Sequence, residues 1–495
     1  MTHHPTDPHP RRWAALAVLS ASLLLVVMDM TILNVALPEL SADLRPDAVQ
    51  LLWIVDVYSL VVAGLLVTAG ALGDRWGRKR MLLSGFAVFG LASVAVLWAD
   101  GSAEVIAVRA LLGVGGAMIM PSTLSMIRSM FTDPGERATA LGIWATMASA
   151  GAALGPIAGG LLLEHFSWQA AFLVNVPVMA AAIAAGLVLL PESRSADPGR
   201  WDAWGTVLSI AGMVALVYAI KHLASDGWTA GTAAAALLAV VALAWFVRRC
   251  LSRPDPLLEI RLFRNGAFTS GTLTALTSSI GLAGMMLILV QWMQLVRDYS
   301  PLQTGLALLP MALGAGVLSP LAPAIAARIG TRTVLAGGMA VSGLGFLALW
   351  TVPLTYPWVA FSLLLIGAGL GSLAVASAVI MSGTPVEKAG SAAAIEETSY
   401  ELGATLGVAV LGSLAAAFYR GGLPENATAQ VRESLGGALV VAQETGSPGL
   451  ADQAELAFTD SLQLTSLYGG ILILVAAAVI WRLTPARLDL ASVQH

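Results

Sequence analysis

Long apolar runs separated by short polar breaks fill most of the chain. A helix needs about 20 apolar residues to cross a bilayer, whereas a barrel strand needs only about ten, so runs of this length favour helices. Lipid offers backbone groups no hydrogen-bond partner, and a helix satisfies those groups internally. The pattern therefore predicts an all-α membrane protein with fourteen spans. They are 13–37, 50–72, 81–99, 104–130, 138–162, 168–190, 204–223, 229–249, 268–295, 302–327, 333–352, 357–382, 391–418 and 461–483.

An internal repeat relates the two ends of this series. Four residues that follow the second span recur after the tenth at an offset of 253, and two glycines of the fifth span recur in the thirteenth at an offset of 252. The pairs are Arg75 and Arg328, Gly77 and Gly330, Lys79 and Arg332, Leu82 and Leu335, Gly151 and Gly403, and Gly155 and Gly407. The repeat predicts two six-helix bundles with two inserted helices between them, which is a layout of transporters with parallel repeats.

These observations give a domain plan. We expect a cytoplasmic tail at 1–12, a first bundle at 13–190, a cytoplasmic linker at 191–203, two inserted helices at 204–249, a cytoplasmic loop at 250–267, a second bundle at 268–483 and a cytoplasmic tail at 484–495. Within the second bundle, 419–460 is an outer loop. This loop either folds or covers the outer mouth, or it is a mobile connection.

Basic residues set the orientation. With the N-terminus inside, twenty of the 26 lysines and arginines fall on the cytoplasmic side and five on the outer side. Basic residues beside spans are retained in the cytoplasm during insertion. Both termini are therefore expected in the cytoplasm.

Composition agrees with a membrane protein and excludes several classes. Apolar residues make up 57% of the chain and charged residues 11%, against about a quarter charged in soluble domains. A net charge of -4 gives no basic field for nucleic acid. Cys250 is the one cysteine, and the six histidines lie in tails or between apolar runs, so neither a disulfide nor a metal site is expected and no catalytic centre is evident.

Ionisable residues in the interiors of the spans are the main candidates for chemistry, because each costs several kcal/mol in lipid unless it faces protein or water. They are Asp29, Asp56, Arg109, Glu396, Glu397 and Glu401. Asp29, Asp56 and Arg109 fall at one level, near the outer ends of their spans. Two interpretations stay open for them, a static ion pair with Arg109 that fixes helix packing or a pair that also exchanges protons.

The thirteenth span carries three of these acids. Glu397 and Glu401 are four residues apart and share one helix face, while Glu396 points about 100° away. Repulsion and burial favour protonation of at least one of the two. Glu396 has a second interpretation, a solvated group at the cytoplasmic end of a cavity.

Two glycine-rich motifs stand at defined places in this layout. The loop after the second span combines a tight turn with an acid and several cations, and contains Gly73, Asp74, Arg75, Gly77 and Arg78. The fifth span allows close helix approach and a proline kink through Gly151, Gly155, Pro156, Gly159 and Gly160. In these positions the two motifs together resemble the major facilitator superfamily.

The resemblance covers essentially the whole chain. The loop at 70–80 is similar to motif A of that superfamily, 108–113 to motif B with its buried arginine, and the fifth span to motif C of antiporters. Span one, at 28–38, resembles the motif of the fourteen-helix drug:proton antiporters. The segments 53–60 and 120–128 and the Glu-Glu run of span thirteen are most similar to the quaternary-ammonium (Qac-type) multidrug exporters.

That resemblance implies a proton-coupled antiporter that exports lipophilic cations such as quaternary ammonium compounds and dyes. It also implies a monomer in the lipid bilayer of the inner (plasma) membrane of a bacterium. The proton gradient would supply the energy, and no cofactor is expected. Asp29, Asp56, Glu396, Glu397 and Glu401 become candidates for protonation and cation binding, with Arg109 as charge partner. The loop at 73–80 is implied to dock at the cytoplasmic seam of the bundles. Exporters of dications can carry a further acid in span ten, and 313–317 has none, so dication transport is not implied.

Aromatic side chains near polar positions are candidates to line a cation path through their π faces. They are Trp53, Tyr58, Trp144, Trp292 and Tyr400. Each one taken alone is also typical of an interface anchor.

Three other functions remain open. A dedicated exporter of one natural product, as in self-resistance, would share every motif. An uptake symporter would also use buried acids, although the antiporter-type fifth span argues against it. A membrane receptor or enzyme would need a soluble domain, a nucleophile or a metal cluster, and no convincing candidate is found. If the antiporter hypothesis holds, Asp29→Asn and Glu397→Gln abolish proton-coupled efflux while the protein still inserts.

Overall fold

The computed structural model describes residues 10–485 except 47, 195–201, 386–387 and 425–426, and the described part consists of helices and their connections, without a strand. The side chains of some helical residues, Asp56 and Pro156 among them, also lie outside the described set.

The first half of the chain and the inserted segment contain nine α-helices among the described residues. They are α1 (Arg12–Leu44), α2 (Ala48–Trp76), α3 (Arg78–Ala95), α4 (Ser102–Met130), α5 (Pro134–Leu163), α6 (Ala170–Leu173), α7 (Asn175–Leu189), α8 (Ala203–Asp226) and α9 (Ala230–Ser252), with short 3-10 turns at Val96–Trp98 and Ile260–Arg264.

The second half is divided into ten described helices. They are α10 (Gly266–Leu295), α11 (Pro301–Ala307), α12 (Leu309–Ile329), α13 (Thr331–Thr351), α14 (Tyr356–Leu370), α15 (Ser372–Ser382), α16 (Ala389–Gly422), α17 (Ala429–Glu433), α18 (Leu435–Thr445) and α19 (Pro448–Leu483).

Thirteen segments of the described chain are long and apolar enough to cross a membrane. α6 with α7, α11 with α12, and α14 with α15 each form one such segment from two consecutive helices. The 30-residue α5, several of whose side chains lie outside the described set, packs among them and supplies the fourteenth span that the sequence predicts.

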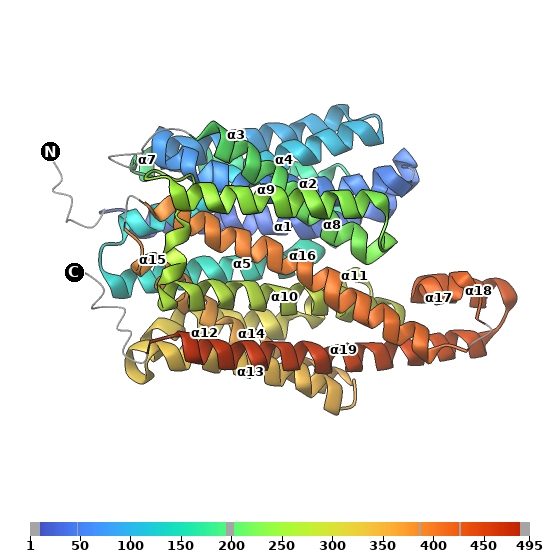
Figure 1. The fold of residues 1–495 in the computed structure, drawn as a ribbon. Helices are drawn as coiled ribbons and strands as arrows, with labels where there is room; N and C mark the ends of the chain where they lie inside the picture. Colours follow the sequence, from blue (N-terminus) through green and yellow to red (C-terminus); the bar gives the residue numbers. More distant parts are fainter. Residues whose placement is uncertain (1–9, 47, 195–201, 386–387, 425–426, 486–495) are drawn as a thin grey trace.

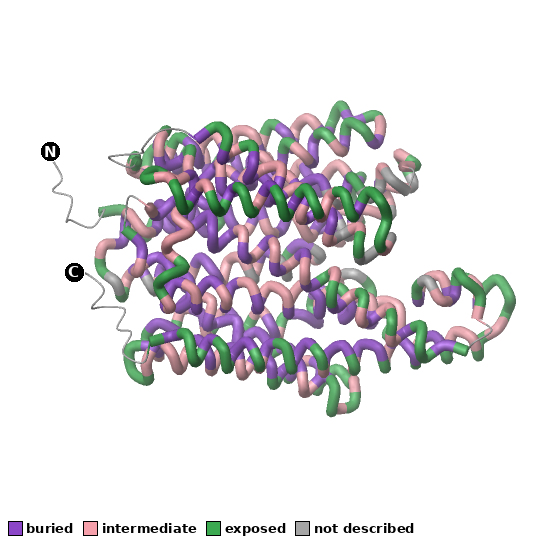
Figure 2. Tube along the Cα trace, viewed as in Figure 1, coloured by how far each residue is buried: buried purple, intermediate pink, exposed green. Residues whose placement is uncertain are grey.

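The long helices run roughly parallel in two groups (Figure 1). In the first group α1 packs along α5, and α4 packs between α2 and α3; in the second, α10 packs along α16, and α13 packs between α14 and α19. Buried residues are concentrated where helices face each other, and exposed ones lie on the outer surface (Figure 2). Apolar side chains therefore serve both the interior and the lipid-facing surface, as in other membrane helix bundles.

The two groups meet at the end of the molecule that the sequence assigns to the cytoplasm. There Phe268, Met381 and Ala392 of the second half join the apolar core of the first half. Arg128 donates a hydrogen bond of 3.0 Å to the Thr384 carbonyl, which also joins the halves. The seam is thus closed at this end.

The inserted pair lies beside this seam. α8 packs against α9 and also against α2 of the first half and α16 of the second. A small apolar cluster marks the junction, with Leu60 and Ala63 from α2, Met213 and Val217 from α8, and Leu402 from α16 at its edge.

The outer loop at 419–460 is where the structure adds most to the sequence pattern. α16 continues to Gly422 and α19 already begins at Pro448, and α17 and α18 fold between them. The pair projects beyond the ends of the other helices (Figure 1). Tyr419 fixes its base by donating a hydrogen bond of 3.1 Å to the Val431 carbonyl. The loop is therefore a folded hairpin of helices.

α1 also extends further than the apolar run that predicts it. Its 33 residues reach Leu44, so Asp29 lies near the middle of the helix. The sequence had placed Asp29 near the outer end of the span, and that prediction was wrong. The extension is stabilised by its polar residues, because the Trp168 side chain donates 2.8 Å to Asp43 and the Trp168 backbone N–H donates 3.2 Å to Glu39.

Candidate functional site

Asp29 lies in a buried polar network in the first half. Only 1% of Asp29 is exposed, and its Oδ2 accepts a hydrogen bond of 3.1 Å from Arg109 Nη1. Its Oδ1 accepts a hydrogen bond of 2.7 Å from Asn175 Nδ2, at the start of α7. Three helices, α1, α4 and α7, therefore supply the carboxylate, its counter-charge and a neutral donor.

Arg109 makes further contacts that hold its guanidinium in place. Its Nε donates 3.3 Å to the Ile54 carbonyl, and its guanidinium lies 4.7 Å from the centre of the Tyr58 ring. A buried ion pair of this kind loses much when one partner is removed, because the other charge stays uncompensated. Between the two partners that the sequence offered, the structure places Asp29 against Arg109, and the side chain of Asp56 lies outside the described residues.

The acids of α16 form a second buried group in the other half. Glu396 and Glu397 are 0% and 1% exposed, and Glu401 is 7% exposed. Glu396 Oε1 accepts hydrogen bonds from the Ser377 hydroxyl and, at 3.4 Å, from the Tyr400 hydroxyl. Glu396 is thus enclosed by protein and does not occupy the solvated position that the sequence also allowed.

Two acids of this second group, Glu396 and Glu397, have no counter-charge among the residues that the structure describes. No described arginine, lysine or histidine forms an ion pair with Glu396 or Glu397. Glu396 Oε2 and Glu397 Oε1 are buried and have no hydrogen-bond partner there. Carboxylates that lack a cation at such depth are costly to ionise, so the neutral form is favoured until a cation or water reaches them.

Tyr58 brings the two groups near each other. α2, which carries Tyr58, packs against α16, and Glu401 is near enough to interact electrostatically with Tyr58. The Tyr58 hydroxyl is buried and has no hydrogen-bond partner among the described residues. The ion pair of the first half and the acids of the second thus flank one inter-bundle seam.

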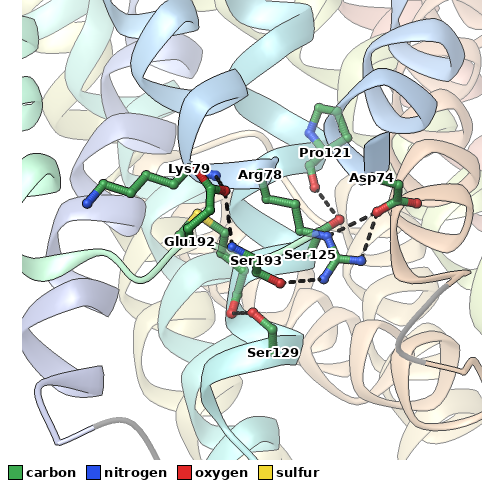
Figure 3. Close-up of polar contacts among 9 residues, drawn as sticks. Asp74, Arg78, Lys79, Pro121, Ser125, Ser129, Glu192 and Ser193 are labelled. Carbon is green, nitrogen blue, oxygen red and sulfur yellow. Dashed lines mark hydrogen bonds and ion pairs between the residues drawn. The ribbon is translucent and has the colours of Figure 1, made fainter. Parts of the chain in front are cut away.

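The glycine turn between α2 and α3 is built around Arg78 (Figure 3). Arg78 donates hydrogen bonds of 3.0 and 2.8 Å to Asp74 Oδ1 and one of 3.1 Å to the Ser193 hydroxyl. Gly77 takes a φ of 116°, which favours glycine. The Asp74 carboxylate also abuts Gly390 at the start of α16, where a Cβ would collide with it. The turn therefore touches both halves.

The linker after α7 closes over this turn. The Ser193 carbonyl accepts 2.8 Å from the Arg78 backbone N–H, and Glu192 Oε1 accepts 3.2 Å from the Lys79 N–H. Sequence patterns did not identify Glu192 or Ser193, because a polar Pro-Glu-Ser segment after a span looks like any linker. Arg75, on the same turn, is half-buried.

The glycines of α5 allow α1 to approach closely. A Cβ on Gly151 would lie 3.2 Å from Leu24 Cα, and one on Gly155 would lie 2.9 Å from the Met28 carbonyl oxygen. A Cβ on Gly159 would meet Ile32 at 3.0 Å, whereas Gly160 has open space. The Pro156 side chain lies outside the described residues. Close packing of α5 thus helps to position Asp29 on α1.

The candidate aromatic residues do not form one lining. Tyr58 and Tyr400 contact the two charged groups, as described above. The Trp144 indole instead donates 3.1 Å to Thr123, and the Trp292 indole donates 3.1 Å to Thr459. Trp53 is 38% exposed on α2. The sequence also missed Asn175 and Ser377, and the only available signal was a neutral polar residue within an apolar run.

Comparison with known proteins now supplies a family. Residues 19–408 match the model of the Major Facilitator Superfamily. The chain is 43% identical to the multidrug efflux pump LfrA of Mycolicibacterium smegmatis, with 97% of each chain covered. It is 36% identical to the methyl viologen resistance protein SmvA of Salmonella typhimurium, over 95% of this chain and 98% of that one.

Among solved structures, the fold is similar to that of the human organic anion transporter MFSD10 (TETRAN). The TM-score is 0.62 at 14% identity, and the match covers 94% of this chain and 100% of that chain. At this identity the likeness concerns the fold alone.

Proposed function

The chain belongs to the major facilitator superfamily and is a multi-pass membrane transporter for drug efflux, and we propose that it exchanges protons for lipophilic cations. The cation is carried out of a bacterial cell across its inner membrane. Both termini lie in the cytoplasm. The proposal assigns no cofactor, because the proton gradient supplies the energy.

The observation that carries the proposal is the absence of a described counter-charge at Glu396 and Glu397. A buried carboxyl without a cation holds a proton readily, and a lipophilic cation that arrives favours release of that proton. Proton and cation then compete for the same group, and competition couples their opposite movements. Each net positive charge that moves inward gains about 2.3 kcal/mol per 100 mV.

The chemistry around Glu396 supports an organic cation as substrate. Tyr400 stands beside Glu396, and an aromatic ring next to a carboxylate suits a diffuse positive charge, which binds both π faces and carboxylates with little desolvation cost. Glu401 adds a third acid one turn from Glu397 and near Tyr58. Quaternary ammonium compounds and cationic dyes have this combination of charge and greasy surface.

Two further groups are assigned supporting roles. The Asp29–Arg109 pair is the second proton-responsive group, and Asp56 on α2 is assigned to the same role. The turn at Gly73–Arg78 with Asp74 and Arg78 fixes the closed seam and must release Gly390 for the bundles to rock apart. The protein is expected to work as a monomer.

Cation efflux from inverted membrane vesicles tests direction and energy source together. We expect uptake of a fluorescent monovalent cation into such vesicles when respiration makes their interior acidic, and collapse of uptake on adding an uncoupler. Uptake that persists with the uncoupler would exclude proton coupling. Uptake only into right-side-out vesicles, driven by an inward proton gradient, would indicate a symporter instead.

A panel of substrates then defines the specificity. Several unrelated monovalent cations distinguish a multidrug pump from an exporter of one natural product. Methyl viologen belongs in the panel because it is a dication and appears in the name of a relative, while span ten here has no acid. We expect monovalent cations to be transported in preference to methyl viologen, and equal rates would contradict that part of the proposal.

A further inference from the structure

α9 is the most exposed of the candidate spans. Only 22% of its most apolar window is buried, the lowest share among the thirteen segments found in the described chain. It lies on the outside of the bundle, against α8 (Figure 1), and most of its length is exposed (Figure 2). Its outward face carries large apolar side chains, Leu237, Val240, Val241, Trp245 and Val247. Because α9 spans the membrane, lipid must cover this face.

One part of that face is hollowed. A shallow groove of about 600 Å³ follows the last three turns of α9 and is lined by Leu243, Ala244, Val247, Arg248, Leu251 and Ser252. These residues form two adjacent rows four residues apart along the helix. Leu243, Val247 and Leu251 make a continuous apolar row, and the small Ala244 and Ser252 leave space beside it.

Arg248 differs from the arginines around it. The adjacent Arg249 forms an ion pair of 2.8 Å with Asp202, and Arg253 approaches the same carboxylate at 3.7 Å. Burial alone would raise the pKa of Asp202, but hydrogen bonds from Arg249 and from the Gly205 N–H outweigh it and hold that pKa below its usual value. Asp202 is therefore ionised and is already paired with Arg249 and Arg253. Arg248, in contrast, is exposed, and no described carboxylate pairs with it.

The depth of Arg248 suits a lipid headgroup. It stands four residues before the end of α9, which is about 6 Å along the axis, so its long side chain reaches the membrane boundary. One turn further in, Trp245 packs edge to face on Trp204 of α8, with ring centres 5.7 Å apart. Tryptophan pairs at this position are typical of the headgroup region of a membrane.

We propose that this groove on α9 binds one anionic phospholipid, with its phosphate on the Arg248 guanidinium and an acyl chain along Leu243, Val247 and Leu251. Arg248 selects this occupant, because no carboxylate of the described residues pairs with its guanidinium. The apolar face of a second copy would bury Arg248 without a counter-charge, which is costly, whereas a lipid phosphate supplies two acceptors for the guanidinium. A zwitterionic lipid offers the same chain with no net negative charge.

Native mass spectrometry of the full-length protein in detergent tests the site. The protein is titrated with phosphatidylglycerol and with phosphatidylcholine of identical acyl chains. We expect wild type to bind phosphatidylglycerol more tightly and Arg248→Gln to weaken that binding about fivefold, the contribution of one arginine near an anionic surface. Arg248→Lys keeps a charge at this position and should retain most of the preference.

Two further variants separate the groove from general surface charge. Val247→Trp fills the groove at an exposed position and should weaken phosphatidylglycerol binding while Arg248 stays in place. Arg482→Gln is the matched control, because Arg482 is also exposed in the last turn of a spanning helix but is not among the residues that line the α9 groove. It should bind phosphatidylglycerol as wild type does.

Three outcomes would overturn the inference. The first is wild-type phosphatidylglycerol binding by both Arg248→Gln and Val247→Trp. The second is an equal loss in Arg482→Gln, which would mean unspecific attraction to charge. The third is a dimer of the wild-type protein that Val247→Trp dissociates, which would place a second copy in the groove. None of these results depends on transport, so they are independent of the proposed function.

Discussion

The two buried acidic groups of this protein differ in the described partners of their carboxyl groups. In the first half, Asp29 has Arg109 at 3.1 Å and Asn175 at 2.7 Å. In the second half, Glu396 has only hydroxyl donors, and Glu397 Oε1 has no hydrogen-bond partner among the described residues. The comparison separates a carboxyl group that has its own guanidinium partner from two acids, Glu396 and Glu397, that need either a proton or an outside cation.

This difference suggests a division of labour. A carboxylate with its own guanidinium responds to a proton only by losing the ion pair, so protonation there would change helix packing. Acids without a counter-charge respond by exchanging their proton for a substrate. The Asp29–Arg109 pair is therefore suited to change helix packing when it is protonated, and the acids of α16 are suited to bind the cation. Substitutions at each position test that assignment.

The largest effect is expected for Glu397→Gln. The amide cannot carry a transferable proton or a negative charge, so proton-coupled cation efflux should fall to the level of vesicles without the protein. Folding should be unimpaired, because the change removes an unpaired buried acid. Dye-cation uptake into inverted vesicles measures efflux activity, and the melting temperature in detergent measures the stability of the fold.

Glu444→Gln is the control for Glu397→Gln, because Glu444 is exposed on the outer hairpin. It should transport as wild type does. Normal efflux by Glu397→Gln would remove Glu397 from the cargo site and leave Glu396 and Glu401 to be tested.

Asp29→Asn should abolish efflux and also destabilise the protein. The neutral side chain leaves Arg109 buried without its counter-charge, a loss of about 3 kcal/mol by analogy with other broken buried pairs. The double variant Asp29→Asn with Arg109→Gln should recover most of the stability. Thermal unfolding in detergent followed by size-exclusion chromatography measures both.

The double variant also decides the role of the pair. If Asp29 must exchange a proton, the double variant stays inactive although it is stable again. If efflux returns together with stability, the ion pair is purely structural, and the division between the two acidic groups fails.

Gly151→Ala tests the packing that positions Asp29. Its Cβ would press on the backbone of Leu24, so α1 and α5 must separate, at a cost of about 1 to 3 kcal/mol for such overpacking. Gly160→Ala is the matched control on the same helix, because open space surrounds Gly160. A shift in melting temperature for Gly151→Ala only is the expected result, and equal shifts would contradict the close approach.

Ser377→Ala should have the smallest effect. It removes a neutral hydrogen bond to Glu396 and leaves the Tyr400 hydroxyl in place. The value of one such bond, about 0.5 to 1.5 kcal/mol, corresponds to a two- to tenfold fall in the efflux rate. Ser377→Thr keeps the hydroxyl and should restore the rate, and an unchanged rate in Ser377→Ala would show that this bond does not matter for transport.

Much of this fold could be predicted from apolar run lengths, because the bilayer imposes one length on every span. The same reasoning could not find the helices at Ala429–Glu433 and Leu435–Thr445, since their 5 and 11 residues are far too few for a membrane span. It also placed Asp29 too near a helix end, because polar residues after the apolar run extend α1.

The candidate site divides in the same way. Charged residues inside spans are rare enough to be recognised one by one, so Asp29, Arg109 and the acids of α16 could be identified from sequence. Their partners could not, because serine and asparagine enter spans at little cost and become informative only when tertiary contacts place them. Asn175, Ser377 and Ser193 are of this kind.

The position of α8 has a consequence for the transport cycle. It touches α2 on one side of the seam and α16 on the other, through Met213, Val217 and their neighbours. If the two halves rock to alternate access, α8 cannot keep its contacts with both α2 and α16. It must move with one half and slide along the other. The contact along which α8 slides would then be part of the transport cycle, and the packing at this contact would influence the rate of the cycle.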